Sequence, residues 1–352
     1  MEVLRVRNVH AALPEAVRMI KLFGRKVETR NGPALRYPEP VCTVYTNPRE
    51  RVLFWPQRDA NPFFHFFEAL WMMNGQQDVA TLTRYVKRMA NFSDDGYVFH
   101  GAYGYRWRQH FKYDPYTGGN YALDQLRLIA ERLRNDPEDR RQVLQIWDCQ
   151  ADLQMQEGKR DLPCNLVATF SMDMGALDMM VFNRSNDIIW GAYGANAVHF
   201  SFLQDVMASL VGCPVGVYRH VSNNWHAYVD TLKKVEELEQ HAAQPAYASD
   251  QPSNPYPEFC TPFSIVNTDP ATWFQDLAMF MSEGARATGY RDIFFRRVAV
   301  PMLLAHDYYK DTARPSNYHA ALDACTDIAA SDWRMACEQW LERRLSRWEA
   351  RR

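Results

Sequence analysis

The chain has 352 residues, of which 47% are hydrophobic and 13% aromatic, so it has ample material for a buried core and is no disordered polymer. Its formal net charge of -2 gives no overall attraction to nucleic acid, so any phosphate recognition has to come from local arginines. Seven cysteines are scattered without a C-x-x-C pair, and no apolar run reaches the ~18 residues that a membrane span needs. We therefore expect a cytoplasmic, globular protein without a metal site and without a nucleic-acid or membrane partner.

The first third of the chain combines short extended segments with two helices. We predict a helix over 13–23, extended segments over 41–46 and 51–55, and a strongly apolar helix over 62–75. Thr29-Arg30-Asn31-Gly32 is typical of a turn that presents an arginine. Glu68 stands out on the apolar helix, because a desolvated carboxylate has to be paired or used in chemistry.

The middle of the chain begins with a glycine- and aromatic-rich loop over 92–108 and a helix over 121–134. Arg140 and Arg141 then lead into a strand over 142–147, where adjacent side chains point to opposite faces. Further segments follow in the order strand, strand, helix, strand and charged helix: 166–172, 176–182, 196–210, 216–221 and 230–241.

After a loop over 242–258, the pattern becomes helical over 273–284, 298–309, 318–329 and 331–350. The fold class expected is α+β, with a catalytic domain over 1–268 and a helical C-terminal extension over 269–352 packed on the same domain. Apolar Trp333, Trp340 and Leu341 recur at helical spacing, which favours simple extension of the core over a roof for a ligand pocket.

The segment from Asp161 to Tyr228 carries the chemistry. Cys164 follows a proline at the start of a predicted strand, where a thiol can face a cleft; a free cysteine is more often an inert buried residue. Arg184-Ser185 offers a positive charge and a hydroxyl, which suit a phosphate monoester and favour thiolate character nearby. Asp187 and Asn196 are also compatible with ordinary capping roles.

The order and spacing of these motifs resemble the thymidylate synthase family from about Arg30 to an expected strand near 263–266. The matching motifs are Pro163-Cys164, Arg184-Ser185-Asn186-Asp187, Gly191, Asn196 and His226-Ala227-Tyr228, with Glu68 and the Arg140-Arg141 pair upstream. The resemblance implies a three-layer fold with a mixed β-sheet at the interface of a homodimer.

The resemblance also implies a role for each matching residue. Cys164 would add to pyrimidine C6, and C5 would then attack 5,10-methylenetetrahydrofolate. The 5′-phosphate would be held by Arg30, Arg184 and Ser185, together with Arg140 and Arg141 of the partner subunit. His226 and Tyr228 would bind the sugar, Asn196 with His199 nearby would read the base, Asp187 and Gly191 would face the folate, and Glu68 would organise water and proton transfer.

Two departures from the family pattern point to a different product. The loop from Trp190 to Asn196 is one residue longer than in the family, so an ungapped match would put Ala195 at the base-reading position. The family's tryptophan that shields the methylene intermediate also has no clear counterpart here, and Phe92 is the nearest candidate for that role. Helical residues and a charged end replace the apolar tail that excludes water, which favours hydration of the transferred carbon.

These departures indicate the nucleotide 5-hydroxymethylase branch of the family. We favour dUMP as the pyrimidine nucleoside monophosphate and leave dCMP and CMP open. The alternatives are a thymidylate synthase that makes dTMP and, from another class, a non-catalytic nucleotide- or RNA-binding relative.

Overall fold

A computed structural model of the protein describes residues 1–113, 121–154, 159–242, 254–256, 258–310 and 315–351. Its centre is a six-stranded sheet in the order β1 (Glu2–Val6), β4 (Val41–Tyr45), β11 (Val215–Ser222), β9 (Ala176–Asn183), β8 (Asn165–Asp173) and β7 (Val143–Gln145). β1 pairs with β4 and β9 with β11 in parallel, whereas the other neighbours are antiparallel. The sheet is therefore mixed, and the predicted α+β class is confirmed.

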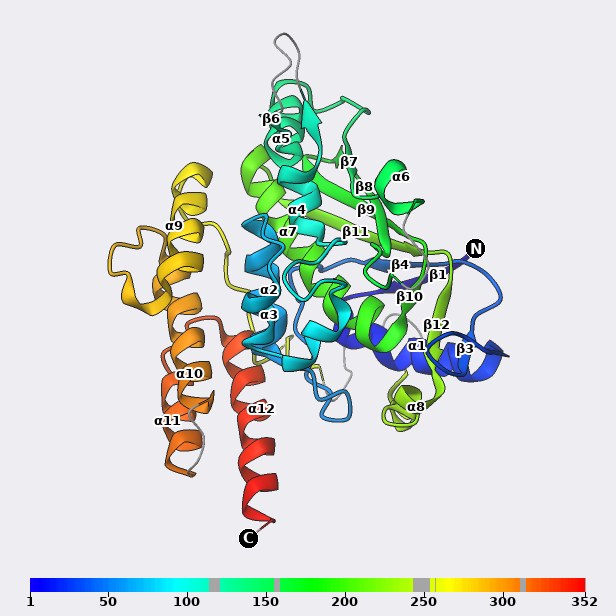
Figure 1. Cartoon of the computed structure of the whole chain (residues 1–352), viewed down its shortest axis with the longest axis vertical. Coiled ribbons are helices and arrows are strands. Elements are labelled where there is room, and N and C mark those ends of the chain that lie inside the picture. The colour runs from blue at the N-terminus through cyan, green and yellow to red at the C-terminus, as the bar shows by residue number, and fades with distance from the viewer. Residues whose placement is uncertain (114–120, 155–158, 243–253, 257, 311–314, 352) are drawn as a thin grey trace.

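The two faces of the sheet differ in what covers them. Helices α5 (Gln125–Asn135) and α7 (Asn196–Val211) lie against one face (Figure 1). Strand side chains alternate between faces, so the buried pair Ala168 and Val181 points one way and the half-buried neighbours Val167 and Phe182 point the other. The second face carries half-buried apolar side chains together with the ion pair of Arg219 and Asp178.

A smaller sheet brings together segments that are distant in the sequence. Its order is β10 (Asn186–Asp187), β12 (Trp225–Tyr228), β3 (Ala34–Arg36) and β2 (Arg25–Val27). The turn between β2 and β3 contains Arg30, and Gly32 in it has a φ of 105°, a conformation that favours glycine. This pairing places the N-terminal turn beside Asp187 and the His226–Tyr228 pair. The remaining two-stranded sheet joins β5 (Lys112–Tyr113) to β6 (Tyr121–Ala122).

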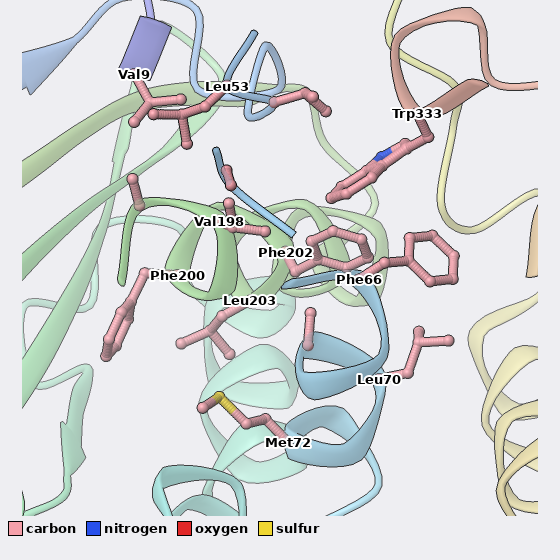
Figure 2. Close-up of a cluster of buried hydrophobic side chains, with 14 of the residues drawn as sticks. Val9, Leu53, Phe66, Leu70, Met72, Val198, Phe200, Phe202, Leu203 and Trp333 are labelled. Carbon is pink, nitrogen blue, oxygen red and sulfur yellow. The ribbon is translucent and has the colours of Figure 1, made fainter. Parts of the chain in front are cut away.

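Helix α2 (Pro62–Met73) lies in the centre of the helical layer, and Asn61 caps its first turn. The C-terminal helices are α9 (Pro270–Glu283), α10 (Val300–Lys310), α11 (Pro315–Cys325) and α12 (Ser331–Glu349). Figure 2 shows Phe66 of α2 between α7 and α12, with its ring centroid 6.0 Å from Phe202 and 5.2 Å from Trp333. The C-terminal helices thus share the apolar core of the catalytic part, and residues 269–352 remain our predicted boundary for the extension.

Several predicted elements differ from the structure. Helix α1 (Val9–Phe23) starts four residues earlier than predicted because Asn8 accepts a hydrogen bond from the backbone of Ala11. The predicted helix over 230–241 is two short pieces, α8 (Val229–Leu232) and a 3-10 helix at Glu236–His241. The predicted extended segment over 51–55 pairs with no other strand, and residues 263–266 form no strand, so the strand prediction for 263–266 was wrong.

The other short helices are α3 (Val79–Thr83), α4 (Tyr103–Tyr105) and α6 (Cys149–Asp152). Across the described ranges, every helix is too short or too polar to cross a bilayer.

Candidate active site

A cavity of about 1190 Å³ opens between α2, the turn that follows β2 and the segment that follows β10. Four predicted site residues line it: Arg30, Glu68, Asp187 and Tyr228. They come from four separate parts of the chain, and the smaller sheet together with α2 brings them to one place. Polar groups from distant segments that converge on a large cavity are the usual sign of a binding site.

The candidate nucleophile Cys164 sits immediately before β8, as predicted. Its backbone amide donates to the hydroxyl of the half-buried Tyr103 at 3.3 Å, which fixes the start of the strand. Burial raises the pKa of the thiol, the positive charges of Arg184 and Arg30 oppose that rise, and the carboxylate of Asp161 adds to it. The thiol is therefore protonated at rest and depends on these two arginines for thiolate character.

Arg184 is built into the loop that carries Cys164. Its Nε donates to the carbonyl of Pro163 at 2.9 Å and one terminal nitrogen donates to that of Leu162 at 3.1 Å, while its amide donates to the carbonyl of Cys164. These bonds leave N–H donors for an anion. Ser185 follows directly and is half-buried, so the Arg-Ser pair lies next to the thiol.

Buried amides form a network behind the thiol. Asn165 donates to Oδ1 of Asn196 at 3.1 Å, and Asn196 donates to Oδ1 of Asn186 at 3.1 Å. Nε2 of His220 lies 3.2 Å from Oδ1 of Asn165, and burial lowers the pKa of His220 to about 3, so this imidazole is neutral. Only a glycine fits at position 191, because a Cβ there would come within 2.6 Å of Oδ1 of Asn186.

The extra residue predicted between Trp190 and Asn196 has a clear structural form. Residues Ile188–Ala195 are a π-helical segment interrupted by non-helical backbone at Tyr193 and Gly194, and the amide of Asn196 donates to the carbonyl of Gly191, five residues back. This kink and wider turn can take up an added residue before the next helix begins. Asn196 therefore begins α7 within the amide network, whereas Ala195 lines the cavity.

Glu68 on the cavity wall lies close to two histidines. Its Oε2 lies 3.1 Å from Nε2 of His199 on α7, and both residues are buried. Neither of these two atoms makes a hydrogen bond of good geometry. His65, one turn earlier on α2, also lines the cavity, and its ring centroid is 6.4 Å from that of His199.

The opposite part of the cavity suits a flat, polar ligand. Asp187 caps the π-helical segment with Oδ1, which accepts from the amides of Ile189 and Trp190, while its buried Oδ2 makes no hydrogen bond of good geometry with the described residues. The Arg58 guanidinium lies 4.2 Å from the centre of the Trp190 ring, and Arg88 stands 5.8 Å from it. An unpartnered acceptor, a flat ring and arginines fit the pterin and carboxylates of a folate.

The residues predicted to bind sugar lie on β12. The rings of His226 and Tyr228 are 5.2 Å apart and nearly perpendicular, and Nδ1 of His226 lies 3.2 Å from the carbonyl of Asn224. The Tyr228 hydroxyl accepts from Asn31 at 3.1 Å. This bond joins the predicted sugar pair to the turn that carries Arg30.

Arg140 and Arg141 lie before the edge strand β7, away from this cavity of the single subunit. Both are exposed, and Arg141 pairs with Asp139 at 2.7 Å. Among the described residues, no group of three or more His, Cys, Asp or Glu side chains is arranged to hold a metal ion.

Sequence reasoning assigned no role to most of the cavity wall, including Arg58, His65 and Trp190. Trp190 was visible only as part of the lengthened loop. Polar side chains on the apolar segment near Glu68 were the available signal for His65, because each such group needs a reason to be buried.

Comparisons with known proteins agree with this geometry. The thymidylate synthase family model matches residues 60–252. The chain is 51% identical over its whole length to a protein of Pseudomonas phage M6 named deoxyuridylate hydroxymethyltransferase, of which it covers 97%. It is 38% identical over 199 residues to a protein of Bacillus phage SP01 with the same name, and the aligned region covers 56% of this chain and 52% of that protein. A putative thymidylate synthase of Methanothermobacter marburgensis is 32% identical over 157 residues, 45% of this chain and 63% of that one.

Proposed function

Because the chain belongs to the thymidylate synthase family and is a one-carbon transferase, we propose that it is a folate-dependent deoxyuridylate 5-hydroxymethylase. The observation that carries this proposal is the 51% identity, over the full chain, to a relative named deoxyuridylate hydroxymethyltransferase. That similarity includes the C-terminal helices, which lie beyond the part matched by the family model.

The nucleotide would lie along the line from the Arg30 turn to the amide network. Arg30, Arg184 and Ser185 would hold its phosphate, and His226 with Tyr228 would hold the sugar hydroxyl. One support for this arrangement is the position of Arg30 on the cavity wall. The other is that the charges of Arg30 and Arg184 oppose the rise in the pKa of the Cys164 thiol that burial causes, as positive charges close to the thiol do.

The amide network supports uracil as the base. After its bonds to Asn165 and Asn186, the Asn196 amide keeps one N–H and one oxygen lone pair. Uracil offers O4 as an acceptor and N3–H as a donor, which is the complementary pair. Cytosine offers a donor at N4 and an acceptor at N3, which the same amide would match only with its N–H and oxygen exchanged. The bonds to Asn165 and Asn186 hold the Asn196 amide in one orientation, so dCMP and CMP match less well. His199 as a second base reader stays a prediction, since it approaches Glu68 instead.

The one-carbon donor of the proposal is 5,10-methylenetetrahydrofolate. Asp187, with its free Oδ2, would bind the pterin, and Gly191 would keep the nearby turn in place. When bound, the folate supplies a carbon at the oxidation level of formaldehyde.

The residues of this chain then act in a fixed order. The Cys164 thiolate adds to C6, which makes C5 a nucleophile toward the one-carbon unit. Loss of the C5 proton, with breakage of the carbon–nitrogen bond to the folate so that tetrahydrofolate leaves, gives an exocyclic methylene on the nucleotide, and water adds to that carbon. Breaking the C6–sulfur bond returns the Cys164 thiolate and releases the 5-hydroxymethyl nucleotide. Glu68, on the cavity wall, would organise the water and the proton transfers.

We also propose a homodimer that completes the phosphate site. The sheet face that carries the half-buried Val167 and Phe182 is suited to pairing with a second copy, and Arg140 and Arg141 are exposed. Mixing an Arg140→Ala/Arg141→Ala variant with a Cys164→Ser variant should restore activity, because one site of each hybrid is complete. Absence of any recovery, with dimers present, would contradict the sharing of arginines. A cytoplasmic location remains the prediction, in keeping with seven free cysteines.

Product analysis tests the proposed function. Wild-type protein with dUMP and 5,10-methylenetetrahydrofolate should yield 5-hydroxymethyl-dUMP and tetrahydrofolate, with slower turnover of dCMP and CMP. Formation of dTMP and dihydrofolate would show a thymidylate synthase instead. A covalent adduct with fluoro-dUMP and folate that disappears in Cys164→Ala would exclude a relative that only binds nucleotides or RNA.

A further inference from the structure

Three ionisable side chains meet beside the cavity, two of them, Glu68 and His65, in its wall, and only Glu68 was expected to take part in chemistry. Glu68 and His65 are three residues apart on α2, which places them one above the other on the same helix face. His199 reaches the same point from α7. All three are at least nine-tenths buried, with exposures of 7%, 6% and 2% for Glu68, His65 and His199.

Two polar atoms in this cluster have unused hydrogen-bonding capacity. Oε2 of Glu68 and Nε2 of His199 approach to 3.1 Å, yet neither completes a hydrogen bond within the described structure. Buried polar groups almost always have a partner, and a water molecule needs two to four polar groups to hold it. The cluster therefore has the chemistry of a water-binding site beside the cavity.

The charge state of His65 suits it to accept a hydrogen bond. Burial and the positive charge of Arg58 hold the pKa of His65 well below its usual range, and the nearby His199 imidazole acts in the same direction. The ring is neutral, and a neutral imidazole always keeps one nitrogen as an acceptor. The charged and titratable groups near it are Arg58 from the preceding loop, His199 from α7 and Glu68 on its own helix.

We propose that His65 is a catalytic residue of the hydration step, accepting a hydrogen bond from the attacking water while Glu68, held by His199, takes the water's proton. This inference rests on the proposed function. The water oxygen bonds to the exocyclic methylene carbon, and the electron pair of the C5–methylene double bond moves toward the C4 carbonyl. It returns as the C5–C6 double bond while the C6–sulfur bond breaks and the Cys164 thiolate leaves. Nothing is oxidised or reduced.

The test separates hydration from the steps before it. With [5-³H]dUMP, tritium release counts loss of the C5 hydrogen, and chromatography counts 5-hydroxymethyl-dUMP; the wild-type ratio of product to tritium should be one. With 2-mercaptoethanol present, His65→Phe should still release tritium, but the ratio should fall roughly tenfold or more as a 5-thioether nucleotide replaces the hydroxymethyl product. His65→Gln, which keeps an acceptor, should recover part of the ratio.

A matched control is His306, which is also buried but lies on α10 against Phe63, 5.4 Å between ring centroids. His306→Phe should keep a ratio of one, and melting curves should show that each variant is folded. If His65→Phe unfolds, His65→Ala takes its place.

Two outcomes would overturn the role of His65. One is a folded His65 variant with the wild-type ratio, and the other is equal loss of tritium release and hydroxymethyl product. If the wild-type protein itself makes dTMP and dihydrofolate, the proposed function fails, and the role of His65 fails with it.

Discussion

Replacing Trp333 with alanine tests how firmly the C-terminal helices are joined to the catalytic core. Trp333 is 5% exposed, and its ring packs against Phe66 of α2 and Phe202 of α7. A buried tryptophan removes about 150–250 Å² of surface from water. At ~25 cal/mol per Å², and allowing for the surface that alanine still buries, Trp333→Ala should lower the free energy of unfolding by roughly 4 kcal/mol. Urea unfolding followed by circular dichroism should show the midpoint falling by about 1 M.

The control for this change is Tyr308→Ala, because Tyr308 is 49% exposed on α10 of the same extension. The free energy of unfolding of the Tyr308→Ala variant should differ from that of the wild type by less than ~1 kcal/mol. The reasoning is refuted if Trp333→Ala costs no more than Tyr308→Ala, or if the C-terminal helices unfold in a separate transition while the rest keeps its stability.

Three further variants test the electrostatics and packing of the site. Burial raises the pKa of Asp59, but hydrogen bonds and charge from three arginines of α12 lower that pKa to about 2. The contribution of the Asp59 carboxylate to folding stability is therefore present above about pH 4 and is lost as the pH falls to about 2. Asp59→Asn should therefore cost about 1 kcal/mol at pH 7, allowing for solvent screening, and nothing near pH 2, as measured by urea titrations. Burial raises the pKa of Asp161 to about 6, so its carboxylate is charged at pH 8, where that charge disfavours the Cys164 thiolate. Asp161→Asn should therefore speed alkylation of Cys164 by iodoacetamide roughly threefold at pH 8. An unchanged alkylation rate would contradict this coupling. Gly191→Ala should weaken dUMP binding, with a cost of roughly 1–3 kcal/mol, by pushing apart the amides that hold Asn196; an unchanged KM would show that the network does not position the base.

The main helices and the long strands could be predicted because their apolar patterns are strong and local. The small sheet could not: β10 has two residues and β2 and β3 have three each, so their pairing depends on contacts between the N-terminal turn and residues about 200 positions later. The motif order indicated that Arg30 belongs with Tyr228, and the antiparallel β12–β3 pairing supplies the physical connection.

The lengthened loop shows what sequence can and cannot predict about a site. The extra residue before Asn196 was evident from the spacing, but its consequence depended on whether it would displace α7 or be accommodated locally. The i to i+5 hydrogen bond from Asn196 to Gly191 accommodates it locally. The contact between Glu68 and His199 had no local signal, because the two residues belong to different helices and meet only through packing.

Oxygen labelling tests the central claim, that water is the final reactant, most directly. In water enriched in ¹⁸O, the wild-type protein with dUMP and 5,10-methylenetetrahydrofolate should form a nucleotide whose new hydroxymethyl group carries one ¹⁸O atom, with tetrahydrofolate as the second product. A 5-methyl nucleotide without label, formed together with dihydrofolate, would contradict the account.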